Sequence, residues 1–425
     1  MKTKLTILLA CVMLISGCSN FPSGKDILTP GPTPSSPETP NPEEDSDTPP
    51  QGLMTLQVWV PPQFDPSLDT PAAQLFQARL EEFSRRHPGV RVSVRVKALE
   101  GPAGLLESLR AAQAAAPLAL PDIVALPARY FEEAYDKNLV YFMENYLSGS
   151  SENDWYEYAA SLGELDGHKA GLTIAGDALI LAYRPSTVGN APLTWDEALE
   201  KTGPLAFAGA DPAAIFPLAL YQANGGNYYN ESGGLSLDEQ PLGELFTFLE
   251  TGALSNSLPF WLTQYDQDVL AWQAFRENRA QMAITWSSQF FSNAPEELSA
   301  APLPTAGGQA FTLADGWVWA LTAPNPDRHQ AAVELAEYLT EAEFIGPWTQ
   351  SIGLLPPRSG ALSLWEVTPY QALASQILPE AVPLPPNQVL AVFGRLFSEN
   401  TISILKQEIK SIEAIEKILG TLNGD

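Results

Sequence analysis

Cys18 is the first residue whose type and setting suggest chemistry, because it ends the run ISGC directly after an apolar segment, residues 5–15. That segment follows two lysines and is too short to span a bilayer, which is typical of an export signal. Two small residues before a cysteine fit the narrow site of a lipoprotein signal peptidase, and the thiol can then carry a thioether-linked diacylglycerol. We therefore expect lipidation at Cys18 and an extracytoplasmic bacterial protein anchored to the cell membrane.

Other reactive patterns are missing from the sequence. Cys11, the second cysteine, lies within the signal, so the mature chain would have no disulfide and no catalytic thiol. The three histidines, His87, His168 and His329, are scattered without ligand spacing, which argues against a metal site. There is no G-x-S-x-G nucleophile motif and no Gly-rich phosphate loop. We expect no cofactor and no metal.

The composition divides the chain into a tether and a folded part. Residues 1–17 are the predicted signal peptide, and residues 18–51, rich in Pro, Ser, Thr and acid, are predicted to form a disordered tether after the lipidated cysteine. About 375 residues follow, which is more than one ordinary core and favours two lobes. The net charge of −27 argues against binding nucleic acid or anionic lipid surfaces.

The folded part opens with alternating strands and helices. The apolar run 53–60 predicts a strand, and Thr70 before Pro71 predicts a capped helix. Valines alternate with polar residues over 90–96, an Ala/Leu helix covers 105–115, and a short buried strand lies at 121–126. This order indicates βαβ units and a mostly parallel sheet.

A second unit is predicted to begin near Ala178. We expect a strand over 178–184, a capping box at Thr194–Glu197, a strand over 281–286, a strand over 317–322 and a helix from 325 or 327 to 339. The stretch from Pro383 to Asp425 has a helical pattern whose role the sequence leaves open.

Several short segments in this order resemble the family 1 extracellular solute-binding proteins of ABC importers, the sugar-binding lipoproteins related to maltose-binding protein. The similar segments are LQVWV, F-x-x-x-HPGV-x-V, PDIVAL, GHKAGLTIAGDALILAYRP, AFRENRAQMAITWSS, APLPTAGG with ADGWVWALTAPNPDRHQAAVELAEYL, and GLLPPR. They extend from Leu53 to about Arg358. Each is weak alone, and their shared order carries the resemblance.

The resemblance implies a two-lobed, hinged α/β fold of the periplasmic-binding-protein type II, with a ligand cleft between the lobes. We place lobe 1 at 52–177 and 304–343, and lobe 2 at 178–303 and 344–425. It also implies a monomeric receptor, not an enzyme, that binds a carbohydrate and delivers it to the permease subunits of an ABC transporter.

The resemblance also implies site residues, since a sugar needs aromatic faces and planar hydrogen-bonding groups. Asp177 lies in the segment that crosses between lobes and matches a ligand-contacting position, although it could instead cap a helix. Trp286 matches a stacking tryptophan, although it could be a core residue. Gly316 and Trp317 begin the return strand and face the cleft by analogy.

Topology adds further candidates, because loops that follow sheet strands border such clefts. The strand ends and one helix end supply Gln63, Phe64, Arg129, Tyr130 and Asn224, with Trp261 and Trp348 as further possibilities. Three alternatives stay open: a receptor for a polyamine or other cationic solute, a surface glycoside hydrolase with paired carboxylates, and a receptor that has lost transport.

Overall fold

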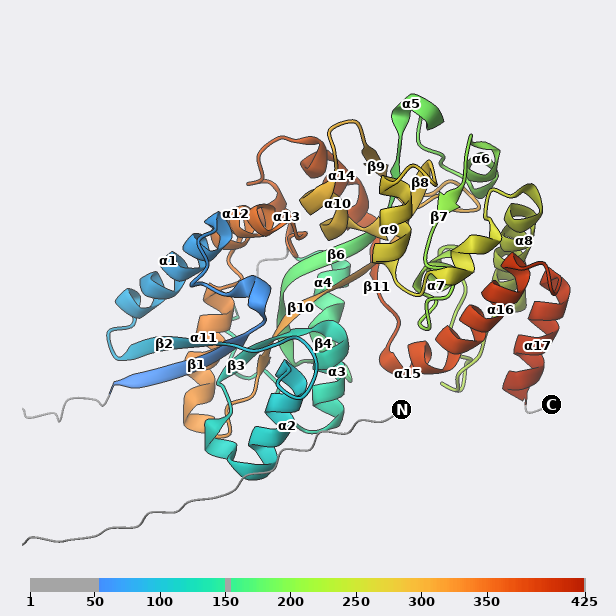
Figure 1. Ribbon diagram of the computed structural model, residues 1–425. Coiled ribbons are helices and arrows are strands. Elements are labelled where there is room, and N and C mark those ends of the chain that lie inside the picture. Colours follow the sequence, from blue (N-terminus) through green and yellow to red (C-terminus); the bar gives the residue numbers. More distant parts are fainter. Residues whose placement is uncertain (1–52, 150–153, 424–425) are drawn as a thin grey trace, which may run out of the picture. The chain divides into compact units, whose positions relative to one another are not determined.

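The computed structural model describes residues 53–149 and 154–423 (Figure 1). The predicted signal peptide, Cys18 and the tether over 18–51 lie outside these residues. Among the described residues, no helix combines the length and apolar character needed to cross a membrane.

The strands form one mixed sheet of nine strands within the described residues, with the central order β2-β1-β3-β10-β6-β8-β7. Their bounds are β1 Met54–Val60, β2 Val90–Val96, β3 Ile123–Pro127, β6 Gly171–Tyr183, β7 Leu205–Ala206, β8 Met282–Trp286, β9 Ser299–Ala301, β10 Thr312–Leu321 and β11 Ala381–Pro383, with a separate hairpin of β4 Glu164–Leu165 and β5 His168–Lys169.

The prediction of a mostly parallel sheet is wrong at its centre. Strands β1, β2 and β3 pair in parallel as expected, but β10 is antiparallel to both β3 and β6, and β6 is antiparallel to β8. The long strands β6 and β10 run side by side through the middle of the fold (Figure 1). These two strands, rather than βαβ crossovers, join the two halves of the sheet.

Helices cover the sheet. Their bounds are α1 Pro71–Arg86, α2 Leu105–Ala115, α3 Ala128–Asp136, α4 Glu157–Leu162, α5 Pro185–Val188, α6 Trp195–Glu200, α7 Ile215–Ala223, α8 Glu239–Ser255, α9 Asp268–Arg276, α10 Ser287–Asn293, α11 His329–Tyr338, α12 Ala342–Ile352, α13 Ser359–Leu362, α14 Pro369–Ile377, α15 Asn387–Val389, α16 Arg395–Leu405 and α17 Ser411–Asn423.

The predicted helix starts are confirmed at α1 and α6. The hydroxyl of Thr70 accepts a hydrogen bond from the backbone N–H of Ala73, and Pro71 is the first helical residue. At α6, Thr194 accepts from the N–H of Glu197, and the Glu197 carboxylate accepts from the N–H of Leu193. The capping box is therefore present, with its return bond one residue earlier than usual.

Two strands are longer than predicted. β6 begins at Gly171 rather than Ala178, and β10 begins at Thr312 rather than Trp317. The additional residues are mostly buried, and small or apolar residues on both faces of a strand remove the alternation that reveals strands in sequence. Each strand thus passes through both halves of the fold.

Large hydrophobic clusters lie on either half of these strands. Leu172 and Ile174 of β6 pack in a cluster with β1 and α1, whereas Leu179 and Leu181 pack in a cluster with α7 and α8. Helix α12 packs against α1 and contributes Trp348 to the first cluster. The lobe boundary at 343/344 stays a prediction, and this packing favours a later position for it.

The C-terminal segment returns to the centre before it becomes helical. β11 pairs in parallel with β10, and the N–H of Leu384 donates to the carbonyl of Ala314. A π-helical turn over Leu390–Gly394 then leads into α16 and α17. The helical pattern predicted from Pro383 onward is confirmed, and the strand before it was not expected.

Candidate functional site

A cavity of about 1080 Å³ lies beside the two central strands, slightly above the usual size of small-molecule sites. Its wall comes from β6, β10, α3, the ends of α4 and β8, the starts of α7 and α9, and residues 383–390. Nine of the residues in the wall are acidic and one is a cationic side chain, Arg129. The acidic residues are Glu132, Asp136, Glu164, Asp166, Asp177, Asp211, Asp266, Asp268 and Asp315.

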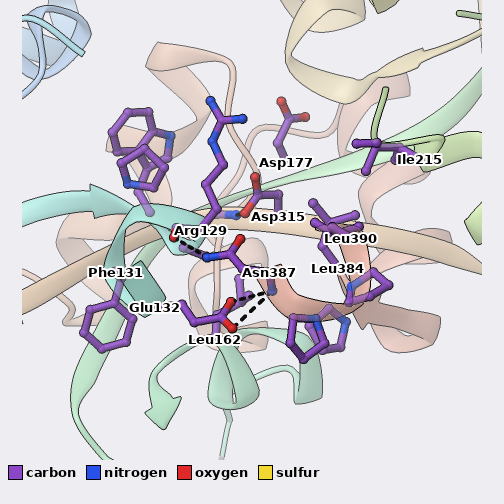
Figure 2. Close-up of a pocket in the computed structure, with 18 of the residues that line it drawn as sticks. Arg129, Phe131, Glu132, Leu162, Asp177, Ile215, Asp315, Leu384, Asn387 and Leu390 are labelled. Atoms are coloured by element: carbon purple, nitrogen blue, oxygen red, sulfur yellow. Dashed lines mark hydrogen bonds between the residues drawn. The ribbon is translucent and has the colours of Figure 1, made fainter. Parts of the chain in front are cut away.

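Asp177 and Asp315 stand directly opposite each other on β6 and β10 (Figure 2). Directly opposed residues of an antiparallel pair point to the same face with their Cβ atoms about 5 Å apart. Like charges in this arrangement repel each other, so the strand register itself concentrates negative charge at the cavity wall.

Each of these carboxylates is fixed by neutral donors. Asp177 accepts hydrogen bonds from the Ser287 hydroxyl at 2.7 Å, from the backbone N–H of Ser288 at 2.9 Å and from the Ser288 hydroxyl. These donors lie at the start of α10, so Asp177 does cap a helix as well as lining the cavity. Asp315 accepts from the N–H of Gly316 at 2.7 Å.

Asp268 and Asp211 form a second acidic pair at the starts of α9 and α7. Asp268 is the first residue of α9 and accepts a hydrogen bond from Nε1 of Trp286 at 2.9 Å. Asp211 accepts from the backbone N–H groups of Ala213 and Ile215, each at 2.9 Å. No ion pair to either carboxylate, or to Asp177 or Asp315, occurs among residues 53–149 and 154–423.

The surroundings make these groups weaker acids than free aspartate. Burial, reinforced by the charge of Asp211, raises the pKa of Asp268 to about 6. Burial also raises the pKa of Asp315 to about 6, with Asp177 adding to the effect and Gly316 N–H and Arg129 opposing it. Burial raises the pKa of Asp177 as well, against its hydrogen bonds. The ionised carboxylates of the wall can therefore accept strong hydrogen bonds, but keeping them ionised lowers the stability of the folded protein.

Aromatic rings border the same cavity. Trp317 lies on β10 and is held edge-on by Phe64, whose ring centroid is 5.0 Å away. Phe64 itself is 2% exposed and also packs on Trp348 at 5.0 Å. The other aromatic residues of the wall are Phe131, Tyr135, Tyr229 and Trp286. The site thus combines flat apolar faces with fixed acceptors.

The segment after β11 closes one side of the cavity by contacts to α3 (Figure 2). The backbone N–H of Asn387 donates to both carboxylate oxygens of Glu132, at 2.9 and 3.1 Å, and its side-chain amide donates to the carbonyl of Arg129 at 2.8 Å. Gln388 donates to the hydroxyl of Tyr229 at 2.8 Å. Residues 384–388 are called the strap below.

The structure brings some of the predicted site residues together and leaves others apart. Those in the cavity wall are Asp177, Trp286, Trp317, Gly316 and Arg129. Outside it lie Gln63, Phe64, Tyr130, Asn224, Trp261 and Trp348. Phe64 supports Trp317 from behind, whereas the hydroxyl of Tyr130 donates to Glu100 at 3.2 Å and Asn224 ends α7.

The sequence does not single out several wall residues with fixed polar groups, among them Asp211, Asp268, Asp315 and Asn387. Asp268 looks like an ordinary acidic residue in a first helical turn. Asp315 directly precedes the candidate Gly316, and this position in the sequence is the feature that could have identified it as a site residue. Its pairing with Asp177, which the resemblance already implies as a site residue, is visible only in the strand register.

The cavity wall is built for binding through oxygen acceptors. In the part of the chain that the structure describes, no group of three or more His, Cys, Asp or Glu side chains has the arrangement of a metal site. Carboxylates fixed beside aromatic faces can accept hydrogen bonds from a neutral polar solute without any bond being made or broken.

The chain matches the model of the bacterial extracellular solute-binding protein family over residues 78–374, and it belongs to that family. The family predicted from the sequence motifs is therefore confirmed, and with it the function class of a solute-binding protein. No curated protein matches the chain.

Solved structures of similar fold include maltose-bound MalE3 of T. maritima, with 18% identity and a TM-score of 0.65 over 87% of this chain and 99% of that chain. The cyclic α-maltosyl-1,6-maltose binding protein of Arthrobacter globiformis has 18% identity and a TM-score of 0.69, again over 87% and 99%. MalE of Xanthomonas citri has 17% identity and a TM-score of 0.69 over 87% and 97%. These similarities establish the two-lobed, hinged fold with its cleft between the lobes.

Proposed function

We propose that this protein is the extracytoplasmic receptor of an ABC importer, and that it binds a carbohydrate in the cavity beside β6 and β10 and delivers it to a membrane permease. The observation that carries the proposal is the pairing of Asp177 and Asp315 with Trp317 and Trp286 in one cavity wall. Two of the similar structures named above bind maltose or a cyclic maltosyl-maltose, and the third is a sugar-binding protein, which supports a carbohydrate ligand.

The cavity wall has hydrogen-bond acceptors and aromatic faces that can replace the water around a sugar. Hydroxyl groups donate to the carboxylates of Asp177, Asp268 and Asp315, and the C–H faces of the ring lie on indole surfaces. The indole, hydroxyl and backbone donors that hold these carboxylates keep them in place before the solute arrives. Binding of this kind requires hydrogen-bonding groups in fixed positions and no chemical step, so we propose a receptor and not an enzyme.

The lipid anchor belongs to the same proposal. Cys18 would carry the lipid, and residues 18–51 would tether the folded part near its permease. These residues lie outside the described part of the chain, and the ISGC sequence is what supports lipidation. Labelling cells with a fatty-acid probe should mark the wild-type protein and leave Cys18→Ala unlabelled. Equal labelling of both would contradict the anchor.

The carbohydrate ligand is tested by a thermal-shift panel on the purified protein. We expect maltose or maltotetraose to raise the unfolding temperature in a saturable way. Glucuronic acid should give a smaller shift, since nine acidic side chains line the cavity. Spermidine tests the cationic alternative, and chromatography of the incubated sugar tests for hydrolysis. A shift with spermidine and none with any sugar, or cleavage of the sugar, would contradict the proposal.

A further inference from the structure

Trp286 borders the cavity and is fixed through the polar edge of its ring. It is the last residue of β8, and its indole N–H donates to Oδ2 of Asp268 at 2.9 Å. The ring is therefore held through its polar edge to a carboxylate on another element, α9. A buried indole N–H usually has an acceptor, and here that acceptor is a carboxylate of the cavity wall.

The hydrogen bond from Trp286 favours the ionised form of Asp268. Asp211 faces it from the segment before α7, and Asp177 faces it from β6, so both neighbouring ionisable groups are anionic. The Trp286 N–H favours the ionised form, against burial and against these two charges. Oδ1 of Asp268 accepts no hydrogen bond from the residues that the structure describes, which leaves it available to a solute.

We infer that Trp286 is a positioning residue, whose indole N–H holds Asp268 so that the second carboxylate oxygen can accept a hydrogen bond from a sugar hydroxyl. This inference rests on the proposed function for its ligand, whereas the pair itself is a contact between two residues of this chain. Trp286 then acts on the solute in two ways, through its aromatic face and through the position of the Asp268 carboxylate.

The pair can be tested without any ligand by following the indole N–H signals in ¹H–¹⁵N spectra from pH 4 to pH 8. The Trp286 signal should titrate with a midpoint near the pKa of Asp268, about 6, and the titration should vanish in Asp268→Ala. Trp195 and Trp365 are matched controls, because their N–H groups donate to the carbonyl of Pro304 and the hydroxyl of Thr349. A Trp286 signal that does not titrate, or that still titrates in Asp268→Ala, would overturn the pairing.

The role in binding is tested by a double-mutant cycle with maltotetraose. Trp286→Phe keeps an aromatic face and removes the donor, so it should weaken binding roughly tenfold, the cost of a hydrogen bond to a charged group. Asp268→Ala should weaken binding at least as much, and Trp286→Phe should then add less than about twofold. Circular dichroism of each variant checks that it is folded.

Two results of the cycle would overturn the positioning role. One is wild-type affinity in Trp286→Phe, and the other is full additivity of the two substitutions. If the wild-type protein binds no carbohydrate, the proposed function fails by itself, and the indole titration still decides whether the Trp286–Asp268 pair exists.

Discussion

Keeping Asp315 and Asp268 ionised in the folded protein costs free energy, and this cost depends on pH. Both have a pKa of about 6 in the folded protein, against an ordinary value of 3.8. The folded state therefore binds protons more tightly than the unfolded chain between these values. The free energy of unfolding should fall as the pH rises from about 4 to about 6 and then level off.

Removing one of these charges should stabilise the protein near neutral pH. We predict that Asp315→Asn is more stable than wild type at pH 7 by on the order of 1 to 3 kcal/mol, and equally stable at pH 4. Urea unfolding at both pH values measures this difference. Glu231→Gln, an exchange at an exposed residue outside the cavity wall, is the control and should leave the stability close to that of wild type at both pH values. An equal gain for Asp315→Asn at both pH values would contradict the account.

At the scale of elements, the close approach of α4 to β6 depends on a glycine. A Cβ atom at Gly176 would lie 2.2 Å from the hydroxyl oxygen of Tyr158 and 2.8 Å from its ring carbon Cζ. Tyr158 is fully buried and its hydroxyl donates to the carbonyl of Pro356, so the ring has little room to move. The central strand is thus fixed against α4 at the residue that precedes Asp177.

We predict that Gly176→Ala destabilises the protein by about 1 to 3 kcal/mol, the usual cost of overpacking. Gly89 is the matched control, because a Cβ atom there would meet nothing within 4 Å. Gly89→Ala should change the free energy of unfolding by less than about 1 kcal/mol. Equal stability of the two variants in urea unfolding would show that α4 does not restrain β6.

The sequence predicts local elements better than it predicts their pairing. The strand at 90–96 and the helix that starts at Pro71 follow from periodicity and capping, and both are confirmed. The full length of β6 was missed because apolar residues cover both of its faces. Asp177 was found by resemblance, but its partner Asp315 depends on the register of two distant strands, which periodicity does not encode.

At the scale of the whole molecule, the strap ties the C-terminal region to α3. The backbone N–H of Asn387 donates to Glu132, a bond between segments far apart in the chain. We predict that Glu132→Ala increases the hydrogen-exchange rate of the Asn387 amide by at least about tenfold, because its acceptor is lost. Glu133→Ala is the control, since Glu133 pairs with Lys137 within α3. Unchanged protection in Glu132→Ala would mean that other contacts hold the strap.

The central claim is that a carbohydrate binds beside β6 and β10, and isothermal titration calorimetry with maltotetraose tests it most directly. The wild-type protein should bind one equivalent in a saturable manner. Asp315→Ala should weaken binding by roughly tenfold or more, because a charged acceptor is lost from the wall. Absence of binding to the wild-type protein, or equal affinity in Asp315→Ala, would contradict the account.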